Sequence, residues 1–504
     1  MIVIKIIFAE DTTKGTQNIK TILHKGNLRD NLDYEKFINY LKDNFCTTFT
    51  DFNGRTIPYN PITVSGESII LPRFAYCELE EYFNMLGVQY KILATKKYPE
   101  LCDVNFGKLK IDLFPAKLKM LSEIEETIKN KNGIIIQLGT GEGKTVLISE
   151  IIRRTNKKIH IVAKTSELQN QMYDDIHENL ILGEDECDNC YRCKISKCNY
   201  IAFNGGKKSK HKHNQNLLKS GNYKILISTI NTARNMPQSI SKDFELTILD
   251  ECHTYTSDEN SNVFNLCNTK YVIGTTATPY HKWNHLIVTH NLGKVVNFNK
   301  YLADRKFNGT VYKIKYRGPP EFTQALLSKT SVLSPAKMVK QFMDDPYRCQ
   351  LIIDNIIEGF NLVGYGYVYG MRNDLLYKLK EMLDIYVATN GINLISVVLC
   401  SETKPEELEL CKTTAHIIFT NYSYSEGLNI PRMRFMVFAS PFKTNCNQIL
   451  GRVLRNNFED MRYYFDIIDI LTALAKQYLK REASYKEKKF TIVERNITYK
   501  EILI

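Results

Sequence analysis

The stretch GIIIQLGTGEGKT, from Gly133 to Thr145, decides the fold of this chain of 504 residues. A run of apolar residues ends in a glycine-rich turn, and residues with a helical pattern follow it directly. This order predicts a buried strand, a tight turn and a helix, the repeating unit of a parallel sheet that is covered by helices.

The same alternation of apolar strands and helical patterns continues over residues 112–300. Further strands rich in Ile and Val are expected at 158–163, 223–228, 244–249 and 271–275. The alternation resumes after residue 346, with candidate strands at 364–370, 393–399, 415–420 and 435–439. We therefore expect an α/β protein with two tandem parallel-sheet lobes.

The segments outside this alternation set the expected domain boundaries. The N-terminal segment mixes short β-like runs with amphipathic stretches, which predicts a small α+β domain. The stretch before the second lobe is irregular and is punctuated by Gly318-Pro319-Pro320, as in a connector. The expected parts are an N-terminal accessory domain at 1–111, lobe 1 at 112–300 with a cysteine-rich insert at 185–215, a connector at 301–346, lobe 2 at 347–480 and a C-terminal tail at 481–504.

The composition bounds the partners and the compartment. The chain carries 67 Lys and Arg against 55 Asp and Glu, and this formal charge of +12 suits a polyanionic partner, although solubility explains it nearly as well. No run approaches the roughly 20 apolar residues that span a bilayer, and the first residues do not resemble a secretory signal. Most of the 13 cysteines are isolated, which fits reduced thiols. We expect an intracellular, soluble protein without a membrane partner.

The glycine-rich turn and a second motif together predict an ATP-hydrolysing site. The backbone amides of the turn, the ammonium of Lys144 and the hydroxyl of Thr145 are groups that cradle phosphates and Mg²⁺. Later in the chain, ILDECH ends an apolar strand in Asp250, which would hold the metal, and Glu251, which would orient water. The predicted ATP-binding residues are Gly139, Thr140, Gly141, Glu142, Gly143, Lys144 and Thr145.

Polar residues follow other expected strands of the first lobe. Lys164 and Thr165 follow one strand, and Thr229 follows the next. The carboxyl ends of parallel strands are where open α/β sheets bind ligands, so these residues could grip a phosphate backbone. Taken singly, each hydroxyl is more simply an ordinary helix N-cap. The run IGTTATPY, at 273–280, has a shape able to sense whether the nucleotide site is filled.

The second lobe contains an arginine motif with helical spacing. In QILGRVLR, Gln448, Arg452 and Arg455 stand at offsets of four and three and would project from one helix face. Two guanidinium groups on one face repel each other unless an anion such as a phosphate chain lies between them. The alternative is a solvated basic helix. Upstream, Gly427 and Asn429 lie in a loop where they could approach nucleotide and nucleic acid.

These motifs resemble those of superfamily 2 helicases and translocases of the DExH kind, which have two RecA-like lobes. The resemblance covers roughly residues 112–470, with seven motifs in the family's order. The chain departs from the family at Leu138, where alanine is frequent, and at LFPAK (113–117), which lacks the glutamine that often reads adenine. By position, the resemblance implies catalytic roles for Asp250, Glu251, Gln448, Arg452 and Arg455, coupling roles for His253, Thr276, Ala277, Thr278, Gly427 and Asn429, and nucleic-acid contacts for Lys164, Thr165, Thr229 and Thr420.

The implied function is an ATP-dependent helicase or translocase that uses ATP and Mg²⁺ to separate or remodel strands. DDPYRCQLI (344–352), and DECHTY (250–255) with TATP, are similar to transcript-release and related helicases of poxviruses, African swine fever virus and iridoviruses. That similarity implies DNA rather than RNA, the transcription machinery as a partner, and the host cytoplasm and the virion as locations. DECH and GRVLR are also similar to phage branch-migrating helicases and repair translocases. An ATPase that remodels protein complexes without unwinding is the third alternative.

One group of cysteines is exceptional because four thiols fall within CDNCYRCKISKC, namely Cys187, Cys190, Cys193 and Cys198. Metal binding is the preferred interpretation, with Zn²⁺ first because it favours tetrahedral thiolate sites, and His211 or His213 could replace one thiol. An iron-sulfur cluster is a lesser alternative, and free thiols on a loop are the remaining one. With the basic stretch at 205–214, the insert could act as a wedge or a nucleic-acid clip.

Overall fold

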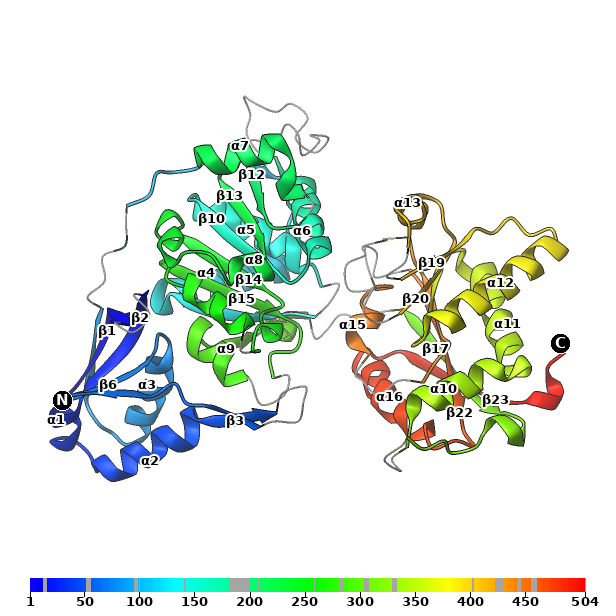
Figure 1. Cartoon of the computed structure of the whole chain (residues 1–504), viewed down its shortest axis with the longest axis horizontal. Helices are drawn as coiled ribbons and strands as arrows, with labels where there is room; N and C mark the ends of the chain where they lie inside the picture. Colours follow the sequence, from blue (N-terminus) through cyan, green and yellow to red (C-terminus); the bar gives the residue numbers. More distant parts are fainter. Residues whose placement is uncertain are drawn as a thin grey trace. The chain divides into compact units, whose positions relative to one another are not determined.

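The computed structural model of this chain consists of two compact units (Figure 1). The first comprises Met1–Leu138 and Gly143–Ala303, and the second comprises Asp304–Ile504 together with Gly139–Glu142. The structure describes all residues except 12–15, 51–55, 95–97, 99, 140–141, 182–199, 207, 258, 281–284, 303–307, 329–332, 401–402, 422–429, 431, 442–445, 455–459 and 504.

The N-terminal part is an α+β fold on a five-stranded sheet, as its mixed pattern predicts. The strand order is β5 (Thr63–Ser65), β6 (Ser68–Pro72), β2 (Thr16–His24), β1 (Ile2–Asp11) and β7 (Tyr90–Ala94). The two amphipathic stretches form helices α2 (Tyr34–Phe45) and α3 (Ala75–Met85). Their apolar positions, including Phe37, Leu41 and Phe83, are buried against the sheet core.

A buried arginine ties this N-terminal part to lobe 1. The guanidinium of Arg73 donates to the carbonyl oxygens of Cys267 at 2.7 Å, Thr269 at 2.9 Å and Lys270 at 2.8 Å. The backbone N–H of Phe74 donates to the carbonyl of His290 at 3.1 Å. One hydrophobic core also runs through both parts. The accessory part and lobe 1 therefore form one compact unit.

Lobe 1 is built on a seven-stranded sheet whose neighbouring strands are all parallel. The strand order is β12 (Ile201–Asn204), β13 (Ile225–Thr229), β10 (Ile159–Ala163), β14 (Leu246–Asp250), β15 (Tyr271–Thr276), β9 (Gly133–Gln137) and β16 (Val295–Asn297). Because all strands run the same way, their carboxyl ends meet at one edge of the sheet.

Helices cover both faces of this sheet because successive strand residues point to opposite sides. In β9, Ile134 and Ile136 belong to one core cluster, whereas Ile135 belongs to the other. The same alternation separates Ile248 from Leu249 in β14. The helices are α4 (Pro115–Lys131), α5 (Lys144–Thr155), α6 (Ser166–Asn179), α7 (Lys212–Ser220), α8 (Ile230–Ala233) and α9 (His285–Leu292).

The expected cysteine-rich insert at 185–215 is corrected in its C-terminal part, because β12 and the start of α7 belong to the lobe itself. β12 is an edge strand of the sheet, and its residues Ile201, Ala202 and Phe203 are buried. The side-chain amide of Asn214 bonds the backbone groups of Phe203 at the edge of this strand. It accepts from the N–H of Phe203 at 2.7 Å and donates to the carbonyl of Phe203 at 2.9 Å. Only four residues make this strand, which is too few for a recognisable alternation.

The second unit repeats the architecture with another seven-stranded, all-parallel sheet. The strand order is β19 (Ser396–Leu399), β20 (Ile417–Thr420), β18 (Gly366–Tyr369), β21 (Phe435–Phe438), β22 (Arg462–Asp469), β17 (Gly309–Arg317) and β23 (Thr491–Thr498). The helices are α10 (Pro335–Asp344), α11 (Pro346–Val363), α12 (Asn373–Thr389), α13 (Pro405–Thr413), α15 (Asn447–Leu450) and α16 (Tyr478–Glu487). The predicted fold class, two tandem RecA-like parallel-sheet lobes, is confirmed.

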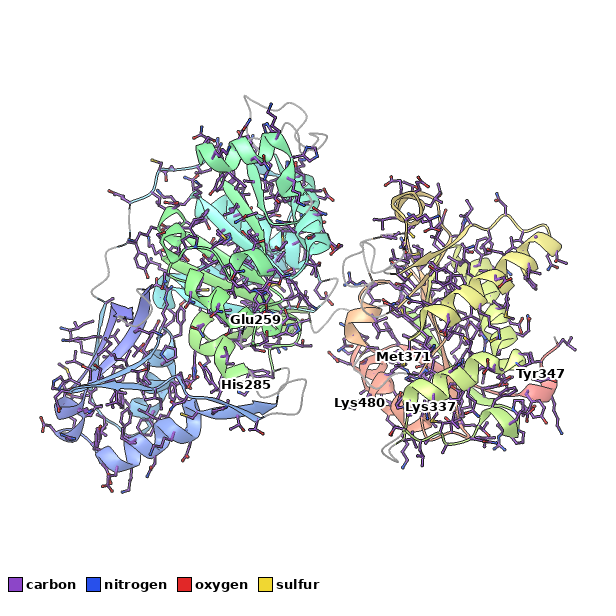
Figure 2. The ribbon with its side chains drawn as sticks, in the orientation of Figure 1. Glu259, His285, Lys337, Tyr347, Met371 and Lys480 are labelled. Atoms are coloured by element: carbon purple, nitrogen blue, oxygen red, sulfur yellow. The ribbon has the colours of Figure 1, made fainter. Side chains whose placement is uncertain are left out.

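The expected connector and C-terminal tail are corrected, because both contribute strands to this sheet. β17 lies in the expected connector and pairs with β22 and with β23, which lies in the expected tail. Lys313 and Lys315 interrupt the apolar pattern of β17, and β23 is a largely exposed edge strand, so neither shows the continuous apolar run of a central strand. Lys337 of α10 and Lys480 of α16 lie on the surface of this unit (Figure 2).

No helix within the described ranges is sufficiently long and apolar to traverse a bilayer.

Candidate nucleotide site

The glycine-rich turn leads from β9 into α5 through a residue that favours glycine. Gly143 has φ 73° and forms the N-cap of α5, and its carbonyl accepts the first helical hydrogen bond, from Leu147 N–H at 3.2 Å. Lys144 and Thr145 begin the helix. The N–H of Glu142 donates to the carbonyl of Gly139 at 3.2 Å, whereas the predicted residues Thr140 and Gly141 lie outside the described residues.

The lysine of this turn contacts both acids at the end of β14. Lys144 Nζ lies 2.6 Å from Glu251 Oε1 and 3.3 Å from Asp250 Oδ1. These three side chains come from two strand ends that the parallel sheet brings to the same edge, one strand apart. The predicted pairing of phosphate loop and acids is therefore a direct contact in the fold.

The electrostatics of this triad keep the lysine charged. Burial disfavours the ammonium form, but the carboxylates of Asp250 and Glu251 outweigh that effect and hold the pKa of Lys144 above its usual value. The side chains of Lys144, Asp250 and Glu251 retain 16, 12 and 22 % of their exposure, so the ion pair remains within reach of a ligand.

Glu251 is held in a backbone conformation that is rare for a residue with a side chain. Its φ is 49°, in the left-handed region, directly where β14 ends and a short 3₁₀ turn, Cys252–Thr254, begins. The carbonyl of Glu251 accepts from both the N–H and the hydroxyl of Thr254 at 2.9 Å. This turn directs the Glu251 carboxylate to Lys144 rather than along the strand.

Two adjacent threonines of β15 connect the acidic motif to the next strand. Thr275 Oγ1 donates to Asp250 Oδ1 at 2.5 Å, and Thr276 Oγ1 lies 2.7 Å from His253 Nδ1. Thr276 Oγ1 also accepts from the N–H of Thr278 at 3.0 Å, across the bend at Ala277. The structure thus brings together His253, Thr276 and Thr278, which the sequence places in one coupling group.

Thr275 was missed by the sequence analysis. It is fully buried and stands opposite Asp250 in the register of β14 and β15. The available signal was a hydroxyl residue at the buried end of a strand, just before the TATP run. That signal needs the register of the two strands before it points to Asp250.

The donor set at this edge fits a hard divalent cation. Asp250, Glu251 and the hydroxyl of Thr145 offer only oxygen ligands, which Mg²⁺ prefers. Within the described parts of the chain, no group of three or more His, Cys, Asp or Glu residues is placed to hold a metal ion. The predicted Zn²⁺ or iron-sulfur ligands, Cys187, Cys190, Cys193 and Cys198, lie outside the described residues. His211 is the N-cap of α7, and His213 lies in its first turn.

The residues predicted to contact nucleic acid lie at the ends of β-strands. The hydroxyl groups of the three threonines among them form hydrogen bonds with residues nearby in the sequence. Thr165 Oγ1 caps α6 by accepting from Leu168 N–H at 3.2 Å. Thr229 is buried, and its hydroxyl lies 3.1 Å from that of Thr232. Thr420, also buried, donates to its neighbour's carbonyl at 3.3 Å. Lys164 follows the end of β10 and is half-buried.

The arginine motif of lobe 2 is less helical than its spacing predicts. The expected single helix through Gln448, Arg452 and Arg455 is corrected to α15, which ends at Leu450. Gly451, the next residue, is a weak helix former. The two residues after it form the tighter hydrogen bonds of a 3₁₀ turn. The N–H of Arg452 donates to the carbonyl of Ile449 and that of Val453 to the carbonyl of Leu450, both at 3.0 Å. Outside the described residues lie Gly427, Asn429, Arg455 and the side chain of Gln448.

The expected tail holds this arginine motif in place. Asn447 at the start of α15 donates to Glu487 of α16 at 2.8 Å. The buried thiol of Cys446 lies 3.8 Å from the backbone carbonyl oxygen of Arg481. The guanidinium of Arg481 forms two hydrogen bonds with the carboxylate of Asp466, each 2.8 Å long. The position of α15 therefore depends on contacts with α16 and β22.

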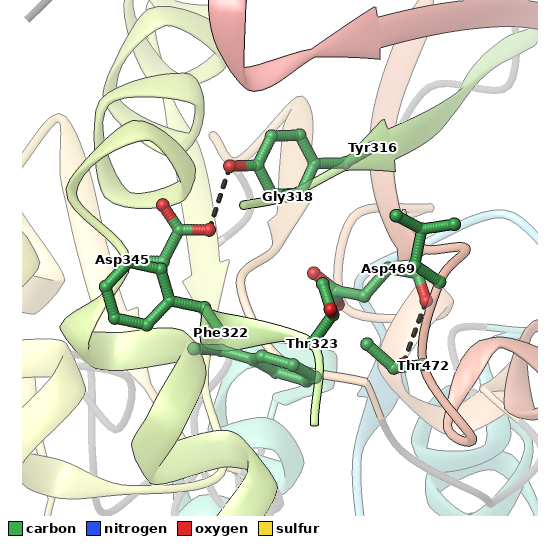
Figure 3. A pocket seen from close by; sticks show the side chains of 9 residues that line it. Tyr316, Gly318, Phe322, Thr323, Asp345, Asp469 and Thr472 are labelled. Atoms are coloured by element: carbon green, nitrogen blue, oxygen red, sulfur yellow. Dashed lines mark hydrogen bonds between the residues drawn. The ribbon is translucent and has the colours of Figure 1, made fainter. Parts of the chain in front are cut away.

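A small cleft in lobe 2 is lined by a second buried network (Figure 3). Tyr316 donates to Asp345 at 2.8 Å, and Arg348 contacts Asp469 at 2.6 and 3.1 Å. Burial raises the pKa of Asp345. Arg348 also donates to the carbonyl of Ala439 at 2.8 Å, so the network fastens α11 to the end of β21 and β22. Its saturated hydrogen bonds indicate a structural role.

Comparison with known proteins agrees with these motifs. Residues 110–281, which include the turn and both acids, match the family described as type III restriction enzyme, res subunit. A protein of African swine fever virus, Warthog/Namibia isolate, is 24 % identical over 505 residues, covering 93 % of this chain and 91 % of the relative. It is named as a proposed ATP-dependent RNA helicase.

The chain is therefore similar to proteins of the helicase kind, as its motifs predict. The family match and the names of the relatives confirm the prediction of a nucleoside-triphosphate hydrolase. A protein of Acanthamoeba polyphaga mimivirus with a similar name is 22 % identical over 392 residues, covering 75 % of this chain and 68 % of the relative. Among solved structures, T4 UvsW covers 98 % of this chain and 99 % of its own at 18 % identity, with a TM-score of 0.39.

Proposed function

We propose that this protein is a nucleic-acid translocase of the superfamily 2 kind, which couples ATP hydrolysis to the separation or remodelling of strands. The observation that carries the proposal is the contact of Lys144 with Asp250 and Glu251, at 3.3 and 2.6 Å, on the same edge as the His253–Thr276 link. The first contact supplies hydrolysis chemistry. The second gives the acidic motif a mechanical connection to the strand beside it.

Each residue of the edge has a distinct task in this proposal. A triphosphate that enters the turn competes with the two carboxylates for the ammonium of Lys144, which frees Glu251 to polarise the attacking water. Thr145 and Asp250 would hold Mg²⁺, which would supply positive charge to offset that of the phosphates. Thr275 donates to Asp250 Oδ1, and the proposal assigns Asp250 Oδ2 to the metal.

In the proposal, lobe 2 completes the site through its arginine motif. By the resemblance, Arg452, Arg455 and Gln448 would act on the γ-phosphate, and Gly427 and Asn429 would couple nucleotide to nucleic acid. Closure of the lobes on ATP and their release after hydrolysis would ratchet a strand. An arginine that stabilises the transferring phosphate contributes ~10³-fold or more, so Arg455→Ala should abolish turnover while nucleotide binding persists.

A basic loop beside the expected strand track supports a polyanionic partner. Lys210, His211 and Lys212 are exposed in the segment Lys208–Lys212, which we call the basic loop. A Cβ atom on Gly205 would lie 2.5 Å from Thr229 Oγ1, so the chain passes directly over the end of β13 before it enters this loop. With the hydroxyls at 165 and 229 engaged locally, we propose that the basic loop and Lys164 make the phosphate contacts.

The polymer and the pathway belong to this proposal as well. The resemblance to viral transcript-release helicases favours DNA, with the transcription machinery as partner, whereas the viral relatives are named as RNA helicases. We keep DNA as the expected activator. Branch migration and the remodelling of protein complexes use the same engine and differ in the substrate that stimulates it.

The test is ATPase activity measured with single-stranded DNA, duplex DNA, branched DNA and RNA, followed by strand displacement on the best activator. We expect stimulation by DNA and displacement of an annealed strand. Stimulation without displacement would support a remodelling ATPase, and a preference for branched DNA would support branch migration. ATPase activity that no nucleic acid changes would contradict the proposal.

A further inference from the structure

Helix α4 carries a lysine that is buried next to the phosphate loop. Lys117 is 1 % exposed, whereas Leu118 and Lys119 on the same helix are exposed. A buried ammonium is costly unless its N–H groups are bonded, so its position needs a reason. Ordinary packing of an amphipathic helix does not supply one, because an apolar residue would fill the same space at lower cost.

The lysine amine contacts the residue that shapes the loop. Lys117 Nζ donates to the carbonyl of Gly143 at 3.1 Å. The same oxygen accepts the first backbone bond of α5, from Leu147 N–H at 3.2 Å. A Cβ atom on Gly143 would lie 3.5 Å from both Cε and Nζ of Lys117, so the side chain lies against the left-handed turn. Lys117 therefore holds the peptide group directly before Lys144.

The charge of this lysine also bears on the ligand. The amino end of α5 carries the positive end of the helix dipole, where a cation is unfavourable and an anion is favoured. Lys117 adds a positive charge to that end, and Lys144 adds another at the next residue after Gly143. A polyphosphate that replaces the carboxylates at Lys144 would interact favourably with both ammonium groups and with the helix end, and a neutral ligand would not.

We propose that Lys117 is a positioning residue of the nucleotide site. It fixes the Gly143 turn so that the backbone amides and Lys144 meet the phosphates, and its charge strengthens polyphosphate binding. This inference rests on the proposed nucleotide site. It concerns phosphate affinity rather than the hydrolytic step, because Lys117 bonds the Gly143 carbonyl of the phosphate loop.

The test compares Lys117→Met with Lys117→Arg, and uses Lys119→Met as the matched control on the exposed face of α4. Readouts are the KM and kcat for ATP, and the Kd for inorganic tripolyphosphate measured by competition with a fluorescent nucleotide. Loss of a charge-assisted hydrogen bond predicts that Lys117→Met raises both KM and Kd at least about tenfold. Its kcat should stay within about threefold, Lys117→Arg should restore most of the affinity, and Lys119→Met should match the wild type.

An unchanged KM and tripolyphosphate Kd in Lys117→Met would overturn the proposal, as would a loss of kcat alone. If Lys117→Met fails to fold, Lys117→Gln takes its place, with the same expectation, because it keeps a donor but lacks the charge. The tripolyphosphate measurement needs no turnover. A chain that hydrolyses no ATP but shows the Lys117 effect would therefore contradict the proposed function and leave this inference standing.

Discussion

The two sheets of this protein treat their buried charges in opposite ways. At the edge of lobe 1, the side chains of Lys144 and Glu251 are paired but keep 16 and 22 % of their exposure. In lobe 2, Arg481 and Asp466 are paired at 1 and 0 % exposure, and Tyr485 donates a further hydrogen bond to Asp466 at 2.7 Å. The same architecture thus holds one pair that a ligand can exchange and another that is sealed into the fold.

Two properties distinguish an ion pair that a ligand could exchange from a structural one: the exposed fraction of its side chains and the number of carboxylate oxygens already bonded. Every oxygen of Asp466 is bonded within lobe 2, so a new ligand gains nothing there. Lys144 has a flexible stem and a compact charge, which can move from carboxylate to phosphate. If this distinction is right, variants of the two pairs should fail in different assays.

The largest expected effect is on turnover, from Lys144→Ala. Removal of the ammonium takes away a charge that meets the phosphates, so kcat/KM for ATP should fall at least about a hundredfold. The thermal midpoint should change little, because Asp250 keeps its bond from Thr275. ATPase assays and thermal unfolding check both parts, with Lys119→Ala as control. Near wild-type turnover would remove Lys144 from the site.

Next is the stability effect of the sealed pair. Arg481→Met leaves Asp466 buried without its bidentate partner, which should cost about 3–5 kcal/mol in unfolding free energy. Lys480→Met, one residue away and exposed, is the control (Figure 2). Urea unfolding followed by circular dichroism measures the difference. Equal midpoints for the two variants would mean that the pair is not structural.

A smaller effect is expected from Thr275→Val, which keeps the side-chain shape and removes one hydrogen bond to Asp250. Loss of a bond to a charged group is worth about 1.5–3 kcal/mol, so kcat should fall roughly tenfold or more. The matched variant Thr276→Val removes the link to His253 instead and should reduce stimulation by nucleic acid. Steady-state kinetics with and without DNA separate the two. The hypothesis fails if both variants behave alike.

The smallest effect concerns the free energy of unfolding in acid, which depends on two buried histidines of lobe 1. Burial lowers the pKa of His160 to about 3 and that of His177 to about 4, below the usual 6.5. Below pH 6.5 the unfolded chain binds more protons than the folded one, so stability falls as the pH drops. At pH 5.5, one such histidine costs about 1.4 kcal/mol relative to neutral pH.

His160→Gln tests this effect, because glutamine does not titrate and its amide reaches about as far as His160 Nε2, which lies 2.9 Å from Ser228 Oγ. Unfolding free energies at pH 7.5 and 5.5 should differ less in this variant than in the wild type, by about 1.4 kcal/mol. His416→Gln in lobe 2, where the histidine is less buried, is the control. An identical pH slope in all three proteins would refute the assignment.

The sequence was sufficient for those parts of the site that are contiguous in the chain. Lys144, Asp250 and Glu251 each follow an apolar strand, and parallel strands bring such positions to one edge. Thr275 and Lys117 needed the fold, because strand register and helix docking set their contacts with Asp250 and Gly143. No local pattern marked either residue, because neither stands in a motif whose position in the sheet is known from sequence.

The second lobe was harder to predict for the same reason. β17 carries Lys313 and Lys315 between buried apolar residues, and β23 is a largely exposed edge strand. Their place in the sheet follows from the pairing of β17 with β22 and β23 rather than from their own periodicity. The spacing of the arginine motif predicted a continuous helix, but α15 ends before Gly451. α16 contacts the start of α15, and Arg462 of β22 donates to the carbonyl of Val453 after it.

We infer that the site around Lys144 and Glu251 at the edge of lobe 1 hydrolyses ATP, and the variant Glu251→Gln is the sharpest test of this inference. The amide keeps the shape and a partner for Lys144 but cannot polarise water as a base, a contribution of about 10²–10⁴ in rate. ATP turnover measured at saturating DNA should fall by that factor, while the Kd for ATP stays near the wild-type value. Turnover equal to that of the wild type would contradict the account.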